Sequence, residues 1–257
     1  MRIGGSFLIM NTTWEELEFF LKQLKSLPVS ESVTLSENGF AVSTGCDIES
    51  WVFYPERVKD IKIAQKVIEF FKAQKVSFMW PVYDGGEKVL EDAGLLYVGS
   101  LTGMVFDPAW HEDLETLIPK RNFKKTDPRI WACAAWHGFG GEYDDVPEKY
   151  FELVKAFSEN KYFSLVTHQT GENHDGTFMI VEKPERKYDP LGLYYFATIP
   201  EMRRKGIARE MMNRICEFAR GRKIFLQATP AGLPFYKDYG FEELCKIPVY
   251  STTTDVF

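Results

Sequence analysis

The chain has 257 residues, of which 45% are hydrophobic, 15% aromatic and 26% charged. This composition is sufficient for a sizeable buried core and excludes extended disorder. The length allows one large domain or two smaller ones, and the net charge of -6, without a Lys/Arg-rich stripe outside one local cluster, argues against a nucleic acid partner.

The sequence argues against several other classes of protein. No apolar stretch approaches the roughly 20 residues that a membrane span requires, and the first residues lack a long apolar segment of signal-peptide type, so we expect a soluble cytoplasmic protein. Four cysteines lie far apart without CxxC spacing, and we therefore expect no metal site and no disulfide framework: Cys46, Cys133, Cys216 and Cys245. The oligomeric state is left open.

The predicted elements of the first half alternate between helices and short strands. A capping box at Thr13 predicts a helix over residues 13–25. Hydrophobic runs between residues 32 and 54, broken by Asn38-Gly39 and Gly45, indicate antiparallel hairpins. There follow a helix over 58–74, a strand over 76–80, a short helix over 85–92 and a strand over 98–106. A polar stretch then predicts a junction between two domains, 1–112 and 113–257.

The second half adds the alternation of an α/β sheet. We expect helices within 131–136 and over 147–157, paired strands over 163–167 and 177–181, and then a strand over 193–197, a helix over 204–220, a strand over 224–228 and a short helix over 233–239. This order predicts an α/β (α+β) fold, with a mixed sheet flanked by helices.

A degenerate internal repeat relates the two halves. Residues 69–76 resemble residues 217–224, and each segment runs into a hydrophobic strand. The tripeptide at residues 54–56 corresponds in the same way to the one at residues 199–201. Because internal similarity indicates repeated structural units, we expect two tandem copies of one fold; chance matches are the alternative.

The most informative segment is residues 193–208, which predicts a strand, a tight turn and the start of a helix. The helix is expected to open with Arg203, Arg204 and Lys205, although the positive end of a helix dipole favours acidic residues. An anion bound to the free backbone N–H groups of the first turn would explain these cations. Gly206 would let the backbone approach that anion closely. The alternative is a solvated basic helix end.

Arg203-x-x-Gly206-x-Ala208 resembles the pyrophosphate-binding motif of the GNAT superfamily of acyl-CoA-dependent N-acyltransferases, which reads (Gln/Arg)-x-x-Gly-x-(Gly/Ala). In that family the motif lies between a central strand and a long helix. A further strand follows, and then a short helix that ends in Tyr-x-x-x-Gly-Phe, which residues 236–241 match. The resemblance covers about residues 113–257. The first half lacks the turn glycine and resembles a degenerate second domain.

The resemblance implies that acetyl-CoA is the acyl donor. The pantetheine arm would lie beside the strand that ends near Thr198, between two splayed strands, and a backbone N–H there would stabilise the oxyanion. Tyr236 would lie near the CoA sulfur, where a phenol can protonate the departing thiolate; packing in the core is the alternative. The implied cofactor-binding residues are Thr198, Ile199, Arg203, Arg204, Lys205, Gly206, Ile207, Ala208 and Thr229. Thr229 stands where many members have an Asn, which puts that contact in doubt.

The acceptor would be a small-molecule or peptide amine that attacks the thioester directly. An alkyl ammonium has no lone pair, so a base or a chain of water molecules must first remove a proton. His137, His168 and Glu182 are candidates, and a surface role is the alternative for each. We therefore expect an N-acetyltransferase, with neither a nucleic acid nor a membrane as partner. The competing hypothesis is a non-catalytic acyl-CoA-binding or interaction module.

Overall fold

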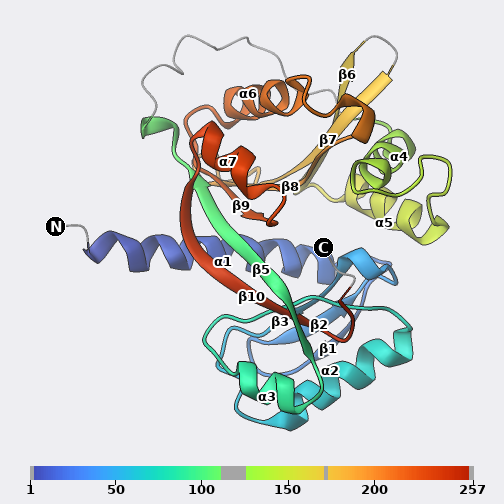
Figure 1. Ribbon diagram of the computed structural model, residues 1–257, viewed down its shortest axis with the longest axis vertical. Helices are drawn as coiled ribbons and strands as arrows, with labels where there is room; N and C mark the ends of the chain where they lie inside the picture. The colour runs from blue at the N-terminus through green and yellow to red at the C-terminus, as the bar shows by residue number, and fades with distance from the viewer. Residues whose placement is uncertain (1–2, 111–125, 171–172, 255–257) are drawn as a thin grey trace. The chain divides into compact units, whose positions relative to one another are not determined.

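The computed structural model describes residues 3–110, 126–170 and 173–254, and Figure 1 labels the helices and strands. The chain divides into two compact units. The first comprises Met1–Gly103, Gln227–Phe235 and Glu243–Phe257, and the second comprises Met104–Leu226 and Tyr236–Glu242. The predicted domain boundary between residues 112 and 113 lies outside the described residues, so a division at that point remains a prediction.

The first unit combines three helices with short strands. Its helices are α1 (Ile3–Lys25), α2 (Ile61–Gln74) and α3 (Glu87–Asp92). Its strands are β1 (Glu31–Thr34), β2 (Phe40–Ser43), β3 (Ser50–Phe53) and β4 (Trp80–Pro81), followed by β5 (Leu96–Phe106), which begins in this unit. The sheet β1-β2-β3 is antiparallel, as predicted for residues 32–54.

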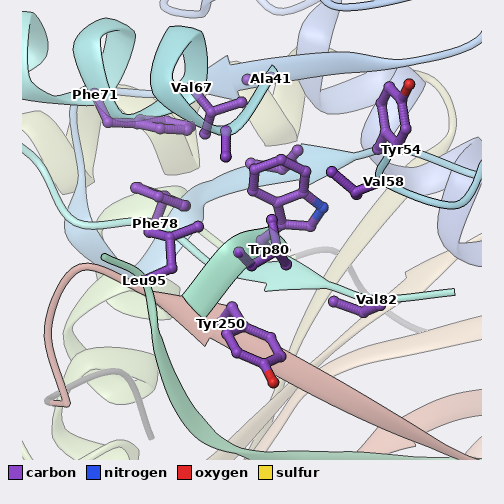
Figure 2. Packing of buried hydrophobic residues seen from close by; sticks show 13 residues of the cluster. Ala41, Tyr54, Val58, Val67, Phe71, Phe78, Trp80, Val82, Leu95 and Tyr250 are labelled. Atoms are coloured by element: carbon purple, nitrogen blue, oxygen red, sulfur yellow. The ribbon is translucent and has the colours of Figure 1, made fainter. Parts of the chain in front are cut away.

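The core of the first unit is a cluster of aromatic and aliphatic side chains, which Figure 2 shows. Phe71 of α2 stacks on Phe78, with ring centroids 4.4 Å apart. Trp80 of β4 is fully buried and lies opposite Tyr250 of β10 (Glu242–Ser251), the last strand of the chain. Since burial of apolar area is the main stabilising term in folding, β10 is part of what holds this unit together.

Three predicted boundaries in this unit were wrong. The helix α1 extends back to Ile3, so Thr13 is buried inside it and has no free first-turn N–H groups to cap. The helix α2 begins at Ile61, because Asp60 is its N-cap and accepts a hydrogen bond from the N–H of Lys62 at 2.9 Å. Only Trp80 and Pro81 form the strand that was expected over residues 76–80.

The second unit is a mixed sheet with helices. The helices are α4 (Pro128–Gly138), α5 (Glu148–Glu159), α6 (Ile207–Ala219) and α7 (Leu233–Tyr239), of which α7 only ends in this unit. The strands are β6 (Phe163–Thr170), β7 (Asn173–Val181), β8 (Leu191–Thr198) and β9 (Ile224–Ala228), of which β9 only begins in this unit. The strands β6, β7 and β8 pair antiparallel, whereas β8 and β9 are parallel. The predicted α/β class is therefore confirmed. No helix in the described part of the chain is long and apolar enough to span a bilayer.

Helices cover both faces of this sheet. On one face, Trp131 of α4 donates from Nε1 to the carbonyl oxygen of Phe178 at 3.1 Å, and Phe157 of α5 packs edge-on against Phe163. Side chains alternate along a strand, so His168 of β6 points to the face opposite Phe163. On that second face it contacts Glu210 of α6, a helix whose buried residues include Ile207, Met211 and Ile215.

The same order of elements occurs twice along the chain. The series β1-β2-β3-α2-β4-α3-β5 recurs as β6-β7-β8-α6-β9-α7-β10. In the first series Trp51 of β3 bridges in parallel to Met79, and in the second Leu191 of β8 pairs in parallel with Ile224 of β9. This order agrees with the duplication predicted from the repeat. The final strand, β10, was not predicted.

Candidate active site

The strands β8 and β9 pair only where they begin. Leu191 lies opposite Ile224 and Gly192 opposite Phe225, and no later pair of these two strands is found among the described residues. On its other side, β8 remains paired with β7 as far as Thr198. The two strands therefore part after their first residues, as expected of a site between splayed strands.

Two β-bulges lie near the end of β8. The pairing of β7 with β6 shifts beside His168 and leaves Asp175 as an extra residue. The pairing of β7 with β8 shifts as well, so that Tyr195 and Phe196 together lie opposite one residue of β7. Tyr195 has φ 51°, a left-handed conformation that is uncommon for a non-glycine residue. Bulges re-aim side chains and occur often beside active sites.

The first bulge engages one of the predicted cofactor-binding residues. The N–H of Ile199, which follows β8, donates a hydrogen bond to the carbonyl oxygen of Asp175 at 3.0 Å. This N–H is therefore already engaged within the protein. The oxyanion-stabilising role predicted for the region of Thr198 and Ile199 would fall to another backbone N–H of β8.

The turn after β8 differs from the prediction in where the helix starts. The helix α6 begins at Ile207, with Gly206 as its N-cap residue, and not at Arg204. Arg203, Arg204 and Lys205 therefore precede the helix. The prediction was wrong because Gly206, at φ 86°, has a left-handed backbone that an α-helix does not continue through.

This turn has the backbone geometry of an anion site. Arg204 at φ 60° and Gly206 at φ 86° are both left-handed, and turns of this kind direct successive N–H groups to one concave side. The first-turn N–H groups of Ile207, Ala208 and Arg209 find no acceptor in the described ranges, as is usual at a helix start. A Cβ atom added to Gly206 would meet no atom within 4 Å, so the space over the turn is open.

The side chain of Arg203 holds this turn to the ends of β8 and α4 by hydrogen bonds. Its Nε donates to the carbonyl oxygen of Thr198 at 3.2 Å, and its Nη2 donates to the carbonyl oxygen of Gly138, the last residue of α4, at 3.0 Å. Gly138 approaches Ala197 of β8 so closely that a Cβ atom on it would lie 2.8 Å from the Cβ of Ala197. Arg204 and Lys205 are exposed, and Nζ of Lys205 lies 3.5 Å from the sulfur of Met202.

His137, also in α4, forms hydrogen bonds close to this turn. Its Nε2 lies 3.0 Å from Oε2 of Glu201, in the short 3-10 helix Pro200–Met202, and its Nδ1 lies 2.9 Å from the carbonyl oxygen of Gly141. Both partners are acceptors, and only an imidazolium can donate to both. The bond to Gly141, opposed by desolvation and supported by Glu201, raises the pKa of His137.

We expect Glu201→Gln to lower the pKa of His137, while the bond to Gly141 keeps part of the shift. Because this pKa is raised on folding, the imidazolium contributes stability below its unfolded pKa of about 6.5, and the contribution is lost as the pH rises through the folded value. NMR titration of the imidazole measures the change. Glu142→Gln, which removes the weakest of the raising causes, is the control and should change the pKa less.

The other two candidate bases lie in different places. Glu182 pairs with Arg222 at 2.9 Å and follows Val181, whose partner Gly192 is at the start of β8, far from Thr198. His168 is only 2% exposed and lies opposite Gly176, which in turn lies opposite Thr198. The structure therefore brings His168, but not Glu182, to the end of β8.

Tyr236 of α7 lies against the second bulge. Its ring centroid is 5.9 Å from that of Phe196 and 5.4 Å from that of Phe241, and 8% of its surface is exposed. Burial raises its pKa far above that of an exposed phenol. The phenol is therefore protonated at neutral pH, and the raised pKa also makes it a weaker acid than an exposed phenol.

Thr229 forms hydrogen bonds with residues that follow it closely in the sequence, and these bear on its predicted role. Its Oγ1 accepts a hydrogen bond from the N–H of Gly232 at 3.3 Å, and its carbonyl oxygen accepts from Gly232 and Leu233 just before α7. The hydroxyl thus helps to start that helix. The described residues contain no group of three or more His, Cys, Asp or Glu side chains that could hold a metal ion.

Sequence reasoning missed two charged residues of this region, Asp175 and Glu210. Asp175 is fully buried at the first bulge, and Glu210 lies on the first turns of α6 with its carboxylate 3.2 Å from His168. Asp175 falls in an Asn- and Asp-rich stretch that is typical of a surface turn, so the sequence carries no signal of its burial. Glu210 lies within reach of Arg214 at helical spacing, which alone indicates a surface pair.

Part of the chain matches a known family, and solved structures share its fold. Residues 161–243 match the acetyltransferase (GNAT) domain family. A GCN5-related N-acetyltransferase from Kribbella flavida has a TM-score of 0.60 at 13% identity, covering 93% of this chain and 95% of that chain. A tandem GNAT protein from the clavulanic acid biosynthesis pathway has a TM-score of 0.56 at 10% identity, covering 88% and 84%. None of the curated proteins compared matches the sequence.

A conserved protein of unknown function from Staphylococcus epidermidis has a similar fold, with a TM-score of 0.54 at 14% identity over 79% of this chain and 82% of that chain. Residues 161–243 thus form a GNAT domain, and the chain has the fold of GNAT proteins, among them a tandem one. The resemblance stated from Arg203, Gly206 and Ala208 is confirmed at this level, which supports a function of acyltransferase type.

Proposed function

We propose that this protein is an N-acetyltransferase that transfers acetyl from acetyl-CoA to an amine by direct attack. The observation that carries the proposal is the turn at Gly206, with its left-handed backbone, its open space and the N–H groups at the start of α6 that find no acceptor in the described part of the chain. This arrangement follows the strand that parts from β9, in a chain segment that matches the GNAT domain family. A cytoplasmic location is part of the proposal.

The residues present fit a CoA pyrophosphate. Backbone N–H groups of Gly206, Ile207 and Ala208 would donate to the phosphate oxygens, as at other helix N-termini. The exposed Arg204 and Lys205 would neutralise the phosphate charge. When bound, acetyl-CoA supplies the activated thioester.

Other predicted cofactor residues would act around this turn. Thr198 and Ile199 end the strand against which the pantetheine arm would lie, and Arg203 would act mainly by holding the turn to Thr198. Thr229 keeps its predicted role as a weaker contact to the arm, since its hydroxyl is engaged locally. Each of these roles can be tested by its effect on the affinity for acetyl-CoA.

The proposed reaction needs two proton transfers. The amine must lose a proton before attack, and the departing thiolate must gain one. Tyr236, kept protonated by burial, would protonate the thiolate. In His137 and His168 both ring nitrogens face acceptor oxygens, so neither presents a lone pair to an incoming amine. We therefore propose that a chain of water molecules carries the proton of the amine to the solvent.

Two measurements on the native chain test the proposal. We expect acetyl-CoA to bind with micromolar affinity in calorimetry, and we expect release of free CoA thiol when small amines or peptides with a free amine are added. Binding with no thiol release from any amine would favour the competing function, a non-catalytic acyl-CoA-binding or interaction module. Absence of binding would contradict both functions.

A further inference from the structure

A fully buried carboxylate in the second unit lies against a buried histidine. Asp175 is 0% exposed, and its carboxylate lies 3.4 Å from Nδ1 of His168, which is 2% exposed. A buried ionised carboxylate without a partner of opposite charge is strongly destabilising. The two side chains lie within ion-pair distance, and neither the ring nitrogens of His168 nor the carboxylate oxygens of Asp175 form an aligned hydrogen bond with another described residue.

The other side of the imidazole faces a second carboxylate. Nε2 of His168 lies 3.2 Å from Oε1 of Glu210, which also accepts from Arg214 at 2.8 Å. A neutral imidazole would turn a lone pair toward one of the two carboxylates, whereas an imidazolium directs an N–H to each. With Arg214 the four charges then sum to zero. The contact with His168, ahead of Arg214, lowers the pKa of Glu210.

Charged side chains near His168 come from β7 and from α6. Strand β7 contributes Asp175, and its His174 turns away to Oγ1 of Thr167 at 3.2 Å. Helix α6 contributes Glu210 and, through it, Arg214. The helices α4 and α5 pack on the other face of β6, at Phe163. Among the residues that the structure describes, the carboxylates of Asp175 and Glu210 thus face the ring directly.

Both carboxylates belong to segments that the proposed cofactor site needs. The carbonyl oxygen of Asp175 accepts the N–H of Ile199, which fixes the chain just after β8. Glu210 is the fourth residue of α6, and its own N–H donates to the carbonyl oxygen of Gly206 at 3.0 Å. His168 therefore links the thioester end of the proposed site to its pyrophosphate end.

We propose that His168 is a positioning residue that, as an imidazolium between Asp175 and Glu210, holds the end of β8 and the first turn of α6 in the arrangement that binds acyl-CoA. This proposal rests on the proposed function. It makes cofactor affinity depend on pH, because loss of the imidazolium proton releases the first turn of α6 from the sheet. The affinity should fall as the pH rises.

Glu210→Gln tests the link without leaving a new buried charge, since the Glu210 side chain is half exposed. Calorimetry with acetyl-CoA from pH 6 to pH 9 is expected to show about tenfold weaker binding than the native chain at the lower pH, with the difference vanishing at the upper pH. Removal of the Glu210 charge near the CoA pyrophosphate would by electrostatics alone strengthen acetyl-CoA binding. Weaker binding would therefore report loss of the link between His168 and Glu210. Glu217→Gln, on the same helix, should keep the native profile.

NMR of the imidazole nitrogens supplies an independent readout on the native chain. We expect both nitrogens of His168 to carry protons at neutral pH; a neutral tautomer would overturn the proposal. Equal affinity of Glu210→Gln and the native chain at every pH, or a difference that persists unchanged at pH 9, would also overturn it. Absence of acetyl-CoA binding by the native chain would remove the proposed function and this role together, whereas the other outcomes remove only the role of His168.

Discussion

Gly206→Glu is expected to weaken acetyl-CoA binding by at least about a hundredfold, or roughly 2.7 kcal/mol of binding free energy. The glycine has φ 86°, a conformation that costs an L-residue about 1–2 kcal/mol, and the new side chain would occupy the open space over the turn. Its carboxylate would repel the pyrophosphate. Calorimetry with the native chain and the variant measures the loss.

Gly221→Glu is the matched control for this experiment. Gly221 follows the other end of α6, has φ 82° and likewise has no atom within 4 Å of an added Cβ. The same strain and the same charge are therefore introduced away from the turn, and affinity should stay close to native. Gly206→Ala adds the strain without the charge and should fall between the two. Unchanged affinity in Gly206→Glu would show that the cofactor binds elsewhere.

Tyr236→Phe is expected to lower turnover about a hundredfold or more while acetyl-CoA affinity changes by less than about threefold. The ring contacts with Phe196 and Phe241 remain, and only the hydroxyl is lost. Because burial raises the pKa of this phenol, it stays protonated through the pH range in which the enzyme would be assayed, and its ionisation should not limit turnover on the alkaline side. Steady-state kinetics with the best acceptor amine separate the two effects.

Tyr239→Phe provides the comparison on the same helix. Tyr239 is also a partly buried phenol with a raised pKa, but its hydroxyl donates to Oδ1 of Asn213 at 2.8 Å. Its loss should lower the free energy of unfolding by about 1 kcal/mol and leave turnover near native. Equal turnover in Tyr236→Phe and the native chain would exclude the acid role, and equal losses in both variants would indicate a packing effect.

The elements whose buried face has a clear period were predictable from the sequence. The stripe of Ile207, Met211 and Ile215 identified α6, because helical spacing of apolar residues is a local property. The start of α6 was less predictable, since the left-handed turn at Gly206 is determined by the chain before it as much as by the glycine itself. Strand β10 was missed because its neighbours in the sheet, β4 and β5, both lie far earlier in the sequence.

The candidate site was predictable as a motif and not as a geometry. Arg203, Gly206 and Ala208 indicated where an anion would bind, and the family match agrees with that segment. Sequence could not show that the side chain of Arg203 turns back to the carbonyl oxygen of Thr198, or that a bulge buries Asp175 against His168. Both depend on strand register, which residues distant in sequence determine together.

The pairing of Trp80 with Tyr250 has a consequence for synthesis of the chain on the ribosome. The other members of the cluster in Figure 2 all precede residue 96, yet Tyr250 emerges some 155 residues after Leu95. At 5–20 residues per second, the nascent first unit would wait roughly 8–30 seconds with its apolar core incomplete. During this interval the N-terminal segment should be a substrate for chaperones, and an mRNA truncated before codon 250 should yield an aggregating product.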